Sequence, residues 1–140
     1  MAALAGLPVE VAVNENPEAG QASSIRAGVA ALPPETEAAL IVLGDQPFLP
    51  PEIIPALVAA LARTGQAIAA PRYRDGRGNP VLFARETFSE LLAIAGDQGA
   101  RPVLERDPGR VALVDFDFQM PQDLDTPEDY DRLRSRSQTR

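Results

Sequence analysis

The stretch AALIVLGDQPFLPPEIIPALVAAL, which runs from Ala38 to Leu61, indicates the fold class of this chain. It begins with an apolar run of strand length, Leu40–Leu43, and it ends with apolar residues at the spacing of a helix. The helical positions are Ile53, Ile54, Leu57, Val58 and Leu61. A buried strand that leads into an amphipathic helix is the repeating unit of α/β proteins, so the stretch predicts an α/β fold.

Asp45 lies at the junction of this strand and helix, within Gly44-Asp45-Gln46-Pro47. One interpretation is structural, because Asp is common in turns and Asp45 would then simply end the strand. The other is functional, because open α/β sheets bind ligands at the carboxyl ends of their parallel strands. The stretch alone leaves both interpretations open.

The rest of the chain continues the alternation of strands and helices. Strands are predicted at Pro8–Val13, Ala39–Leu43, Ala67–Ala70, Val81–Phe83 and Val111–Phe116. Helices are predicted at Gln21–Leu32 with Ser23 or Ser24 as cap, Pro51–Arg63, Glu86–Ala95, Gln98–Arg106 and Pro127–Arg134. This order predicts one three-layer α/β domain with a mainly parallel sheet over residues 1–134, followed by a disordered basic tail over residues 135–140.

The composition excludes several kinds of chemistry. The 140 residues contain neither cysteine nor histidine, which excludes disulfides, thiolate nucleophiles, Ser-His triads and His- or Cys-based zinc sites. A metal ion in this chain must have oxygen ligands, which favours magnesium or calcium.

The charge pattern narrows the expected partners and location. The net charge is -7 and no basic stripe is present, so no nucleic-acid partner is expected. No apolar run approaches the roughly 20 residues of a membrane span, so no membrane partner is expected. The first residues lack the pattern of a signal peptide, which makes the cytoplasm the expected location.

A second acidic cluster lies near the end of the chain, where Asp123 and Asp125 precede Thr126-Pro127. Thr126 is a typical helix N-cap with Pro127 at the first helical position, and carboxylates near a helix start favour its dipole. The structural interpretation of both acids is therefore capping. The functional interpretation is that Asp125, or Asp123 in its place, meets Asp45 across the sheet and binds one magnesium ion.

Two polar loops are further candidates for binding sites. The segment Arg72–Asn79 is either a solvated loop or a loop that approaches a substrate through Asn79 and backbone groups. In the segment Gly96–Arg101, Gly96 and Asp97 have plain capping roles, whereas Arg101 could bind an anionic substrate.

Five segments in the same order resemble the molybdenum cofactor cytidylyltransferase family, within the wider MobA-like nucleotidyltransferases. They are NENPEAGQASSIRAG, VLGDQPFL, GRGNPVLF, GDQGAR and DLDTPEDY, and together they extend over most of the chain from Asn14 to Leu133. The pairing of GRGNPVLF with GDQGAR resembles the cytidylyl branch more than the guanylyl branch. The resemblance implies a Rossmann-like fold of the nucleotide-diphospho-sugar transferase type.

The resemblance also implies a reaction, in which a molybdopterin-type phosphate attacks the α-phosphate of CTP and pyrophosphate leaves. Asp45 and Asp125 would be the catalytic and Mg²⁺-binding residues, with Asp123 as the substitute ligand. The implied nucleotide-binding residues are Gly20, Gln21, Ser23, Ser24 and Gly44. The implied acceptor-binding residues are Gly78, Asn79, Asp97 and Arg101.

One departure from the family is large. The family begins with a strand and a Gly-rich LAAGxSxRxGxxK loop that cradles the triphosphate, and this sequence contains neither that loop nor any lysine. We therefore expect an amino-terminally truncated domain that is weak or inactive alone and that self-associates through an exposed sheet edge. The alternatives are a non-catalytic α/β fragment or substrate-binding module, and a guanylyl- or sugar-nucleotidyltransferase of the same superfamily.

Overall fold

Strand β1 (Ala38–Ile41) and helix α2 (Ile53–Thr64) form where the opening stretch predicts them. The computed structural model describes residues 2–137. The remaining helices are α1 (Gln21–Ala30), α3 (Phe88–Leu91), α4 (Arg101–Arg106) and α5 (Pro127–Ser137). The remaining strands are β2 (Ile68–Tyr73), β3 (Gly76–Arg77), β4 (Val81–Ala84) and β5 (Val111–Asp115). Short 3₁₀ turns occur at Ala2–Leu4, Pro17–Ala19, Arg85–Thr87 and Pro108–Arg110.

The strands form one mixed sheet with the order β1-β4-β2-β3, and β5 also pairs with β2. The β2–β5 pair is parallel, whereas the β1–β4, β2–β4 and β2–β3 pairs are antiparallel. This corrects the expectation of a mainly parallel sheet. Residues 74–80 between β2 and β4 are too few for a parallel crossover, which needs about a dozen residues or more. The longer connection from β4 to β5 contains α3 and α4 and allows the parallel pair.

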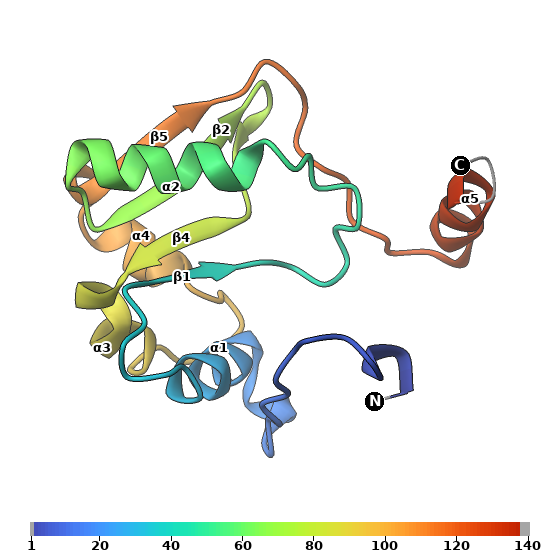
Figure 1. The fold of residues 1–140 in the computed structure, drawn as a ribbon, viewed down its shortest axis with the longest axis horizontal. Helices are drawn as coiled ribbons and strands as arrows, with labels where there is room; N and C mark the ends of the chain where they lie inside the picture. The colour runs from blue at the N-terminus through green and yellow to red at the C-terminus, as the bar shows by residue number, and fades with distance from the viewer. Residues whose placement is uncertain (1, 138–140) are drawn as a thin grey trace.

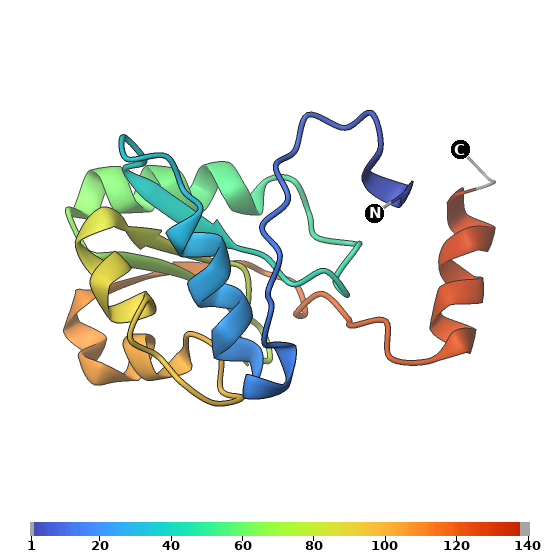
Figure 2. The same cartoon turned by 90° about the horizontal axis from the view of Figure 1, so that it is seen from below.

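Helices cover both faces of the sheet, which confirms the predicted three-layer α/β class (Figures 1 and 2). On one face, Ile53 and Leu57 of α2 pack with Ala69, Tyr73 and Leu82 of the sheet. The other face packs against α1, α3 and α4 through a larger core: Ala22, Val29, Ala67, Ile68, Ala70, Val81, Phe83, Leu91, Ile94, Val103 and Leu104. Alternate residues of β2 face opposite cores, as the two-residue period of a strand requires.

No strand forms at Pro8–Val13 within the described residues, so this prediction is wrong. The segment is extended and its alternating Val9, Val11 and Val13 are 53%, 47% and 70% exposed. A segment with alternating apolar residues forms a strand only when an adjacent strand pairs with its backbone and a core covers its apolar face. Neither is available to this segment in residues 2–137.

Helix boundaries differ from the predictions in smaller ways. Gly20, rather than Ser23 or Ser24, is the N-cap of α1, and no side chain caps this helix. The predicted loop 72–79 instead includes the end of β2 and the two-residue strand β3. The predicted helix 86–95 is shorter, because a 3₁₀ turn precedes α3 and α3 ends at Leu91.

Helix α5 lies apart from the three layers in both views (Figures 1 and 2). The guanidinium of Arg136 lies 5.1 Å from the ring centroid of Phe48, in the loop before α2. The sequence predicts a tail from residue 135; α5 continues to Ser137, and residues 138–140 lie outside the described part. In residues 2–137 no helix combines the length and apolar character that a membrane crossing requires.

Candidate functional site

Asp45 lies in a turn that follows β1, four residues after the strand ends at Ile41. The backbone N–H of Gln46 donates to the carbonyl of Leu43 at 3.3 Å and closes this turn. Pro47, Pro50 and Pro51 then restrict the chain before α2 begins. The carboxylate of Asp45 is therefore presented just beyond the carboxyl end of β1, as the sequence predicts.

Asp123 and Asp125 lie in the segment between β5 and α5, directly before the capped start of α5. Thr126 Oγ1 accepts from the backbone N–H of Asp129 at 3.2 Å, and Asp129 Oδ2 accepts from the N–H of Thr126 at 3.1 Å. This reciprocal pair is a capping box and confirms the predicted helix start. Hydrogen bonds from Thr126 hold the pKa of Asp129 below its usual range. Thr126 and Asp129 thus cap the helix, and the side chains of Asp123 and Asp125 are not part of this capping pair.

The two acidic segments meet at one place. Asp45, Asp123 and Asp125 each offer a carboxylate oxygen, and these oxygens all lie within 4.8 Å of one another. The N–H of Leu124 donates to the carbonyl of Asp45 at 2.8 Å, which joins the two backbones. The geometric part of the sequence prediction, that Asp45 approaches Asp125 and Asp123, is confirmed.

The donor set of this cluster suits a hard divalent cation. All three carboxylates are exposed, and like charges at such short range repel unless a cation lies between them. In an octahedral magnesium site, neighbouring ligand oxygens are about 3.0 Å apart and opposite ones about 4.2 Å apart, because each Mg–O distance is about 2.1 Å. Small side-chain rotations would close the remaining gap, so the residues present fit such an ion.

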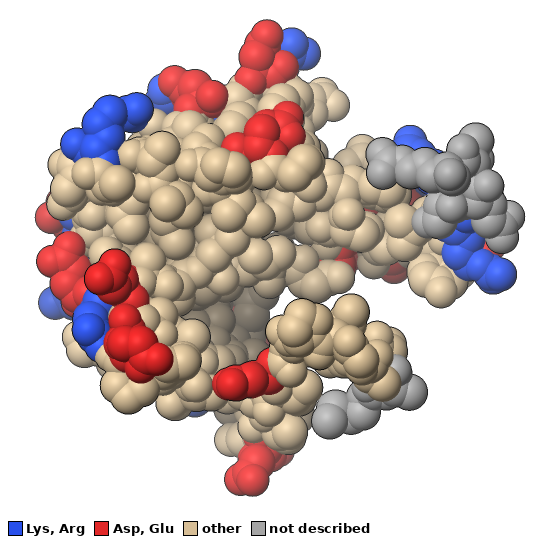
Figure 3. Space-filling view, in the orientation of Figure 1, with Lys and Arg blue, Asp and Glu red and all other residues tan. Residues whose placement is uncertain are grey.

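A cleft of about 910 Å³ lies beside the acidic cluster. Its walls come from α1, from β1 and the turn after it, from residues 77–83 and from residues 98–104. Asp45, Asp123 and Asp125 do not line the cleft themselves, but Gly44, which does, directly precedes Asp45 in the chain. Figure 3 shows the hollow between the regions of β1 and α1, with mostly uncharged surface around it.

The predicted nucleotide-binding residues divide into two groups. Gln21, Ser24 and Gly44 line the cleft. Gly20 and Ser23 do not line it, and the buried hydroxyl of Ser23 donates to the carbonyl of Gly20 at 2.6 Å. These two residues shape the start of α1, and their contact with a nucleotide stays a prediction.

The predicted acceptor-binding residues Gly78, Asn79 and Arg101 also line the cleft. Asp97 does not; it lies so close to Gly20 that a Cβ added to this glycine would be 2.5 Å from Asp97 Oδ1. Arg101 Nε donates to Glu105 Oε1 at 2.7 Å, and this partner raises the pKa of Arg101. Glu105 therefore already neutralises the cation that the sequence assigns to an anionic substrate.

Sequence reasoning missed two residues at this site. The Tyr73 hydroxyl donates to the carbonyl of Asn79 at 2.5 Å and holds the loop that lines the cleft. Burial, and secondarily the charge of Asp75, raises the pKa of Tyr73 to about 12, so the hydroxyl keeps its proton at neutral pH. Gln46 is the second residue, and its side chain contacts Asp123. The sequence signal that could have identified Gln46 is its position directly after Asp45, the predicted metal ligand.

A family model, described as the MobA-like NTP transferase domain, matches residues 1–111. The chain belongs to this family. Its predicted Rossmann-like type is thereby confirmed, as is the wider superfamily to which the five segments point.

Two relatives and one solved structure illustrate the MobA-like relationship. The chain is 31% identical to the purine catabolism protein PucB of Bacillus subtilis, over 87% of this chain and 60% of PucB. It is 30% identical to a probable molybdenum cofactor guanylyltransferase of Natronomonas pharaonis, over 96% of this chain and 69% of that protein. Rv0371c of Mycobacterium tuberculosis, solved in complex with manganese, matches with a TM-score of 0.67 and 32% identity, over 79% of this chain and 58% of Rv0371c. The chain thus spans about three fifths of the length of PucB and Rv0371c.

Proposed function

We propose that this MobA-like domain transfers CMP from CTP to a molybdopterin-type phosphate acceptor and releases pyrophosphate. The observation that carries the proposal is the convergence of Asp45, Asp123 and Asp125 beside a cleft of about 910 Å³. Nucleotidyl transfer requires an ordered phosphate and neutralised charge more than a covalent nucleophile, so the absence of His and Cys is compatible with it.

Each part of the site has a proposed role. Asp45 and Asp125, with Asp123 as a third ligand, hold a divalent ion, for which we propose Mg²⁺. When bound, the ion neutralises phosphate charge and polarises the α-phosphate. The α1 wall with Gln21 and Ser24 would accept the nucleotide, and the wall with Asn79 and Arg101 would accept the phosphorylated partner. Glu105 would then have to release or orient Arg101 when an anion binds.

GTP is the second candidate nucleotide. The relative from Natronomonas pharaonis carries the name of a guanylyltransferase, and this chain covers 69% of it. CTP is favoured by the pairing of GRGNPVLF with GDQGAR, because this pairing resembles the cytidylyl branch of the family more than the guanylyl branch. A comparison of the two nucleotides in one assay decides between them.

The test measures pyrophosphate release from CTP and from GTP with a molybdopterin-type acceptor and Mg²⁺. We expect little release by the 140-residue chain, which contains no lysine. A version extended by the Gly-rich segment of the family should be faster, because preorganised phosphate donors contribute about a hundredfold or more each. In that version Asp45→Asn should reduce the rate by a similar factor, whereas Asp117→Asn should not, since Asp117 is exposed and pairs with Arg74.

Three outcomes would change the proposal. Faster release from GTP would replace CMP transfer by GMP transfer. Nucleotide binding without turnover in the extended version would favour a substrate-binding module. Turnover that does not depend on Asp45 would show that the acidic cluster is not the reaction centre.

A further inference from the structure

Gln46 is a buried polar residue within the exposed acidic cluster. It is 7% exposed, although the three neighbouring carboxylates are exposed. Burial of a side-chain amide is unfavourable unless the amide is hydrogen-bonded. The position of Gln46 therefore calls for a specific partner.

That partner is Asp123. The Gln46 Nε2 amide donates to Asp123 Oδ1 at 2.6 Å, although the two residues are 77 positions apart in the sequence. The amide must present its NH₂ group, because its carbonyl oxygen would repel a carboxylate. A carboxylate has about four acceptor sites, so this bond orients Asp123 and leaves sites free for a cation.

A second bond lies directly beside the first. The N–H of Leu124 donates to the carbonyl of Asp45 at 2.8 Å. Two consecutive residues of one segment thus bind two consecutive residues of the other. The backbone bond sets the separation of the segments, and the Gln46 bond sets the direction of the Asp123 side chain.

We propose that Gln46 is the positioning residue of the metal site: it holds Asp123 in the orientation in which this carboxylate, with Asp45 and Asp125, binds a divalent cation. This inference rests on the metal site of the proposed function and names the residue that preorganises it. Hydrogen-bond partners of metal ligands typically change metal affinity by about 10- to 100-fold when they are removed.

The test titrates Mn²⁺ alone into the full 140-residue chain and measures free Mn²⁺ by electron paramagnetic resonance. Gln46→Met keeps the length of the side chain and removes the amide, and it should raise the Kd about 10- to 100-fold. Gln122→Met is the matched control, because Gln122 is exposed and adjacent to Asp123; its Kd should equal that of the unmodified chain.

A double-mutant cycle separates positioning from general stability. In an Asp123→Asn background, Gln46→Met should cause no further loss of Mn²⁺ affinity, because Gln46 acts through Asp123. Gln46→Asn, which keeps the amide but shortens its reach, should also weaken Mn²⁺ binding. It replaces Gln46→Met in the experiment if that variant does not fold. Thermal unfolding in the presence of a chelator, which removes divalent metal, measures how much the Gln46 side chain contributes to the stability of the fold itself.

The possible results are distinguishable. A lower melting temperature with unchanged Mn²⁺ affinity in both Gln46 variants would overturn the inference and leave the metal site standing. If the losses of Mn²⁺ affinity caused by Gln46→Met and Asp123→Asn were additive, Gln46 would not act through Asp123, and the inference would be wrong. Failure of the unmodified chain to bind Mn²⁺ would overturn both this inference and the metal-dependent part of the proposed function.

Discussion

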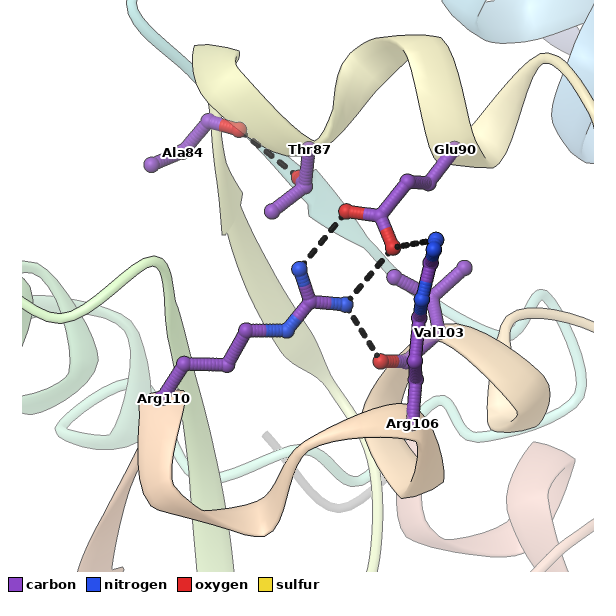
Figure 4. Close-up of polar contacts among 6 residues, drawn as sticks. All are labelled: Ala84, Thr87, Glu90, Val103, Arg106 and Arg110. Carbon is purple, nitrogen blue, oxygen red and sulfur yellow. Dashed lines mark hydrogen bonds and ion pairs between the residues drawn. The ribbon is translucent and has the colours of Figure 1, made fainter.

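At the scale of single residues, Glu90 of α3 is the most heavily bonded acid on the face opposite α2. Arg110 Nη1 donates to Glu90 Oε2 at 2.6 Å and Arg110 Nη2 to Oε1 at 2.8 Å, while Arg106 Nη1 donates to Oε1 at 2.9 Å (Figure 4). Arg110 Nη2 also donates to the carbonyl of Val103 at 2.8 Å. One carboxylate thus joins α3, α4 and the turn before β5.

The hydrogen bonds from Arg110, followed by those from Arg106, hold the pKa of Glu90 below its ordinary value of 4.5. A lowered pKa in the folded state stabilises the fold above about pH 4.5, and this contribution disappears as the pH falls through the folded-state pKa. Glu90→Gln should therefore lower the free energy of unfolding by about 1–3 kcal/mol at pH 7 and by much less near pH 3. Urea unfolding at both pH values measures this, with exposed Glu18→Gln as control; a loss that does not depend on pH would contradict the account.

At the scale of elements, the start of α1 packs against the loop that follows α3. Gly20 has a φ of 97° and a side chain there would lie 2.6 Å from the carbonyl oxygen of Gly96. The N–H of Ala22 donates to that same carbonyl at 3.0 Å. Only glycine allows this approach, which places α1 and the 98–101 segment on neighbouring walls of the cleft.

Gly20→Ala should destabilise the fold by about 1–3 kcal/mol, because both the positive φ and the close backbone contact oppose a Cβ atom. Gly28→Ala is the matched control in the same helix. A Cβ at Gly28 meets nothing within 4 Å, and alanine there should stabilise by about 0.5–1 kcal/mol. Thermal or urea unfolding of both variants checks the prediction, and equal effects of the two substitutions would refute it.

At the scale of the whole molecule, β1 is an edge strand, and among the described strands it pairs only with β4. Residues of β1 line the cleft, and Val42, which continues the strand, is 49% exposed. Unpaired strand edges with apolar surroundings pair readily with other chains. The extended segment with exposed Val9, Val11 and Val13 adds a second unpaired backbone.

We expect the 140-residue chain to self-associate at micromolar concentration through the edge of β1. Val42→Lys should shift the distribution toward monomer, because a charge on a strand edge disfavours pairing with another chain. Val58→Lys is the control, since Val58 is similarly exposed at 51% but lies on helix α2 rather than on a strand edge. Sedimentation velocity measures the distribution. A monomeric unmodified chain, or equal effects of both lysines, would rule out association through β1.

Local patterns in the sequence were enough to predict most elements and to single out the acids of the candidate site. The strands at 38–41, 68–73, 81–84 and 111–115 and the helices at 21–30 and 53–64 follow local periodicity, which depends on neighbours a few residues away. Asp45, Asp123 and Asp125 could also be named as candidate oxygen ligands, because each acid follows an apolar segment and the chain offers no His or Cys ligand. The tertiary structure is what brings their carboxylate oxygens within 4.8 Å of one another.

Which strands pair, and in which direction, depends on the tertiary structure. Residues 8–13 have a strand pattern without a partner, and the short connection before β4 makes its pair with β2 antiparallel. The burial of Gln46 likewise depends on a segment 77 positions away. These properties arise from contacts distant in sequence, and no local pattern of residues encodes such contacts.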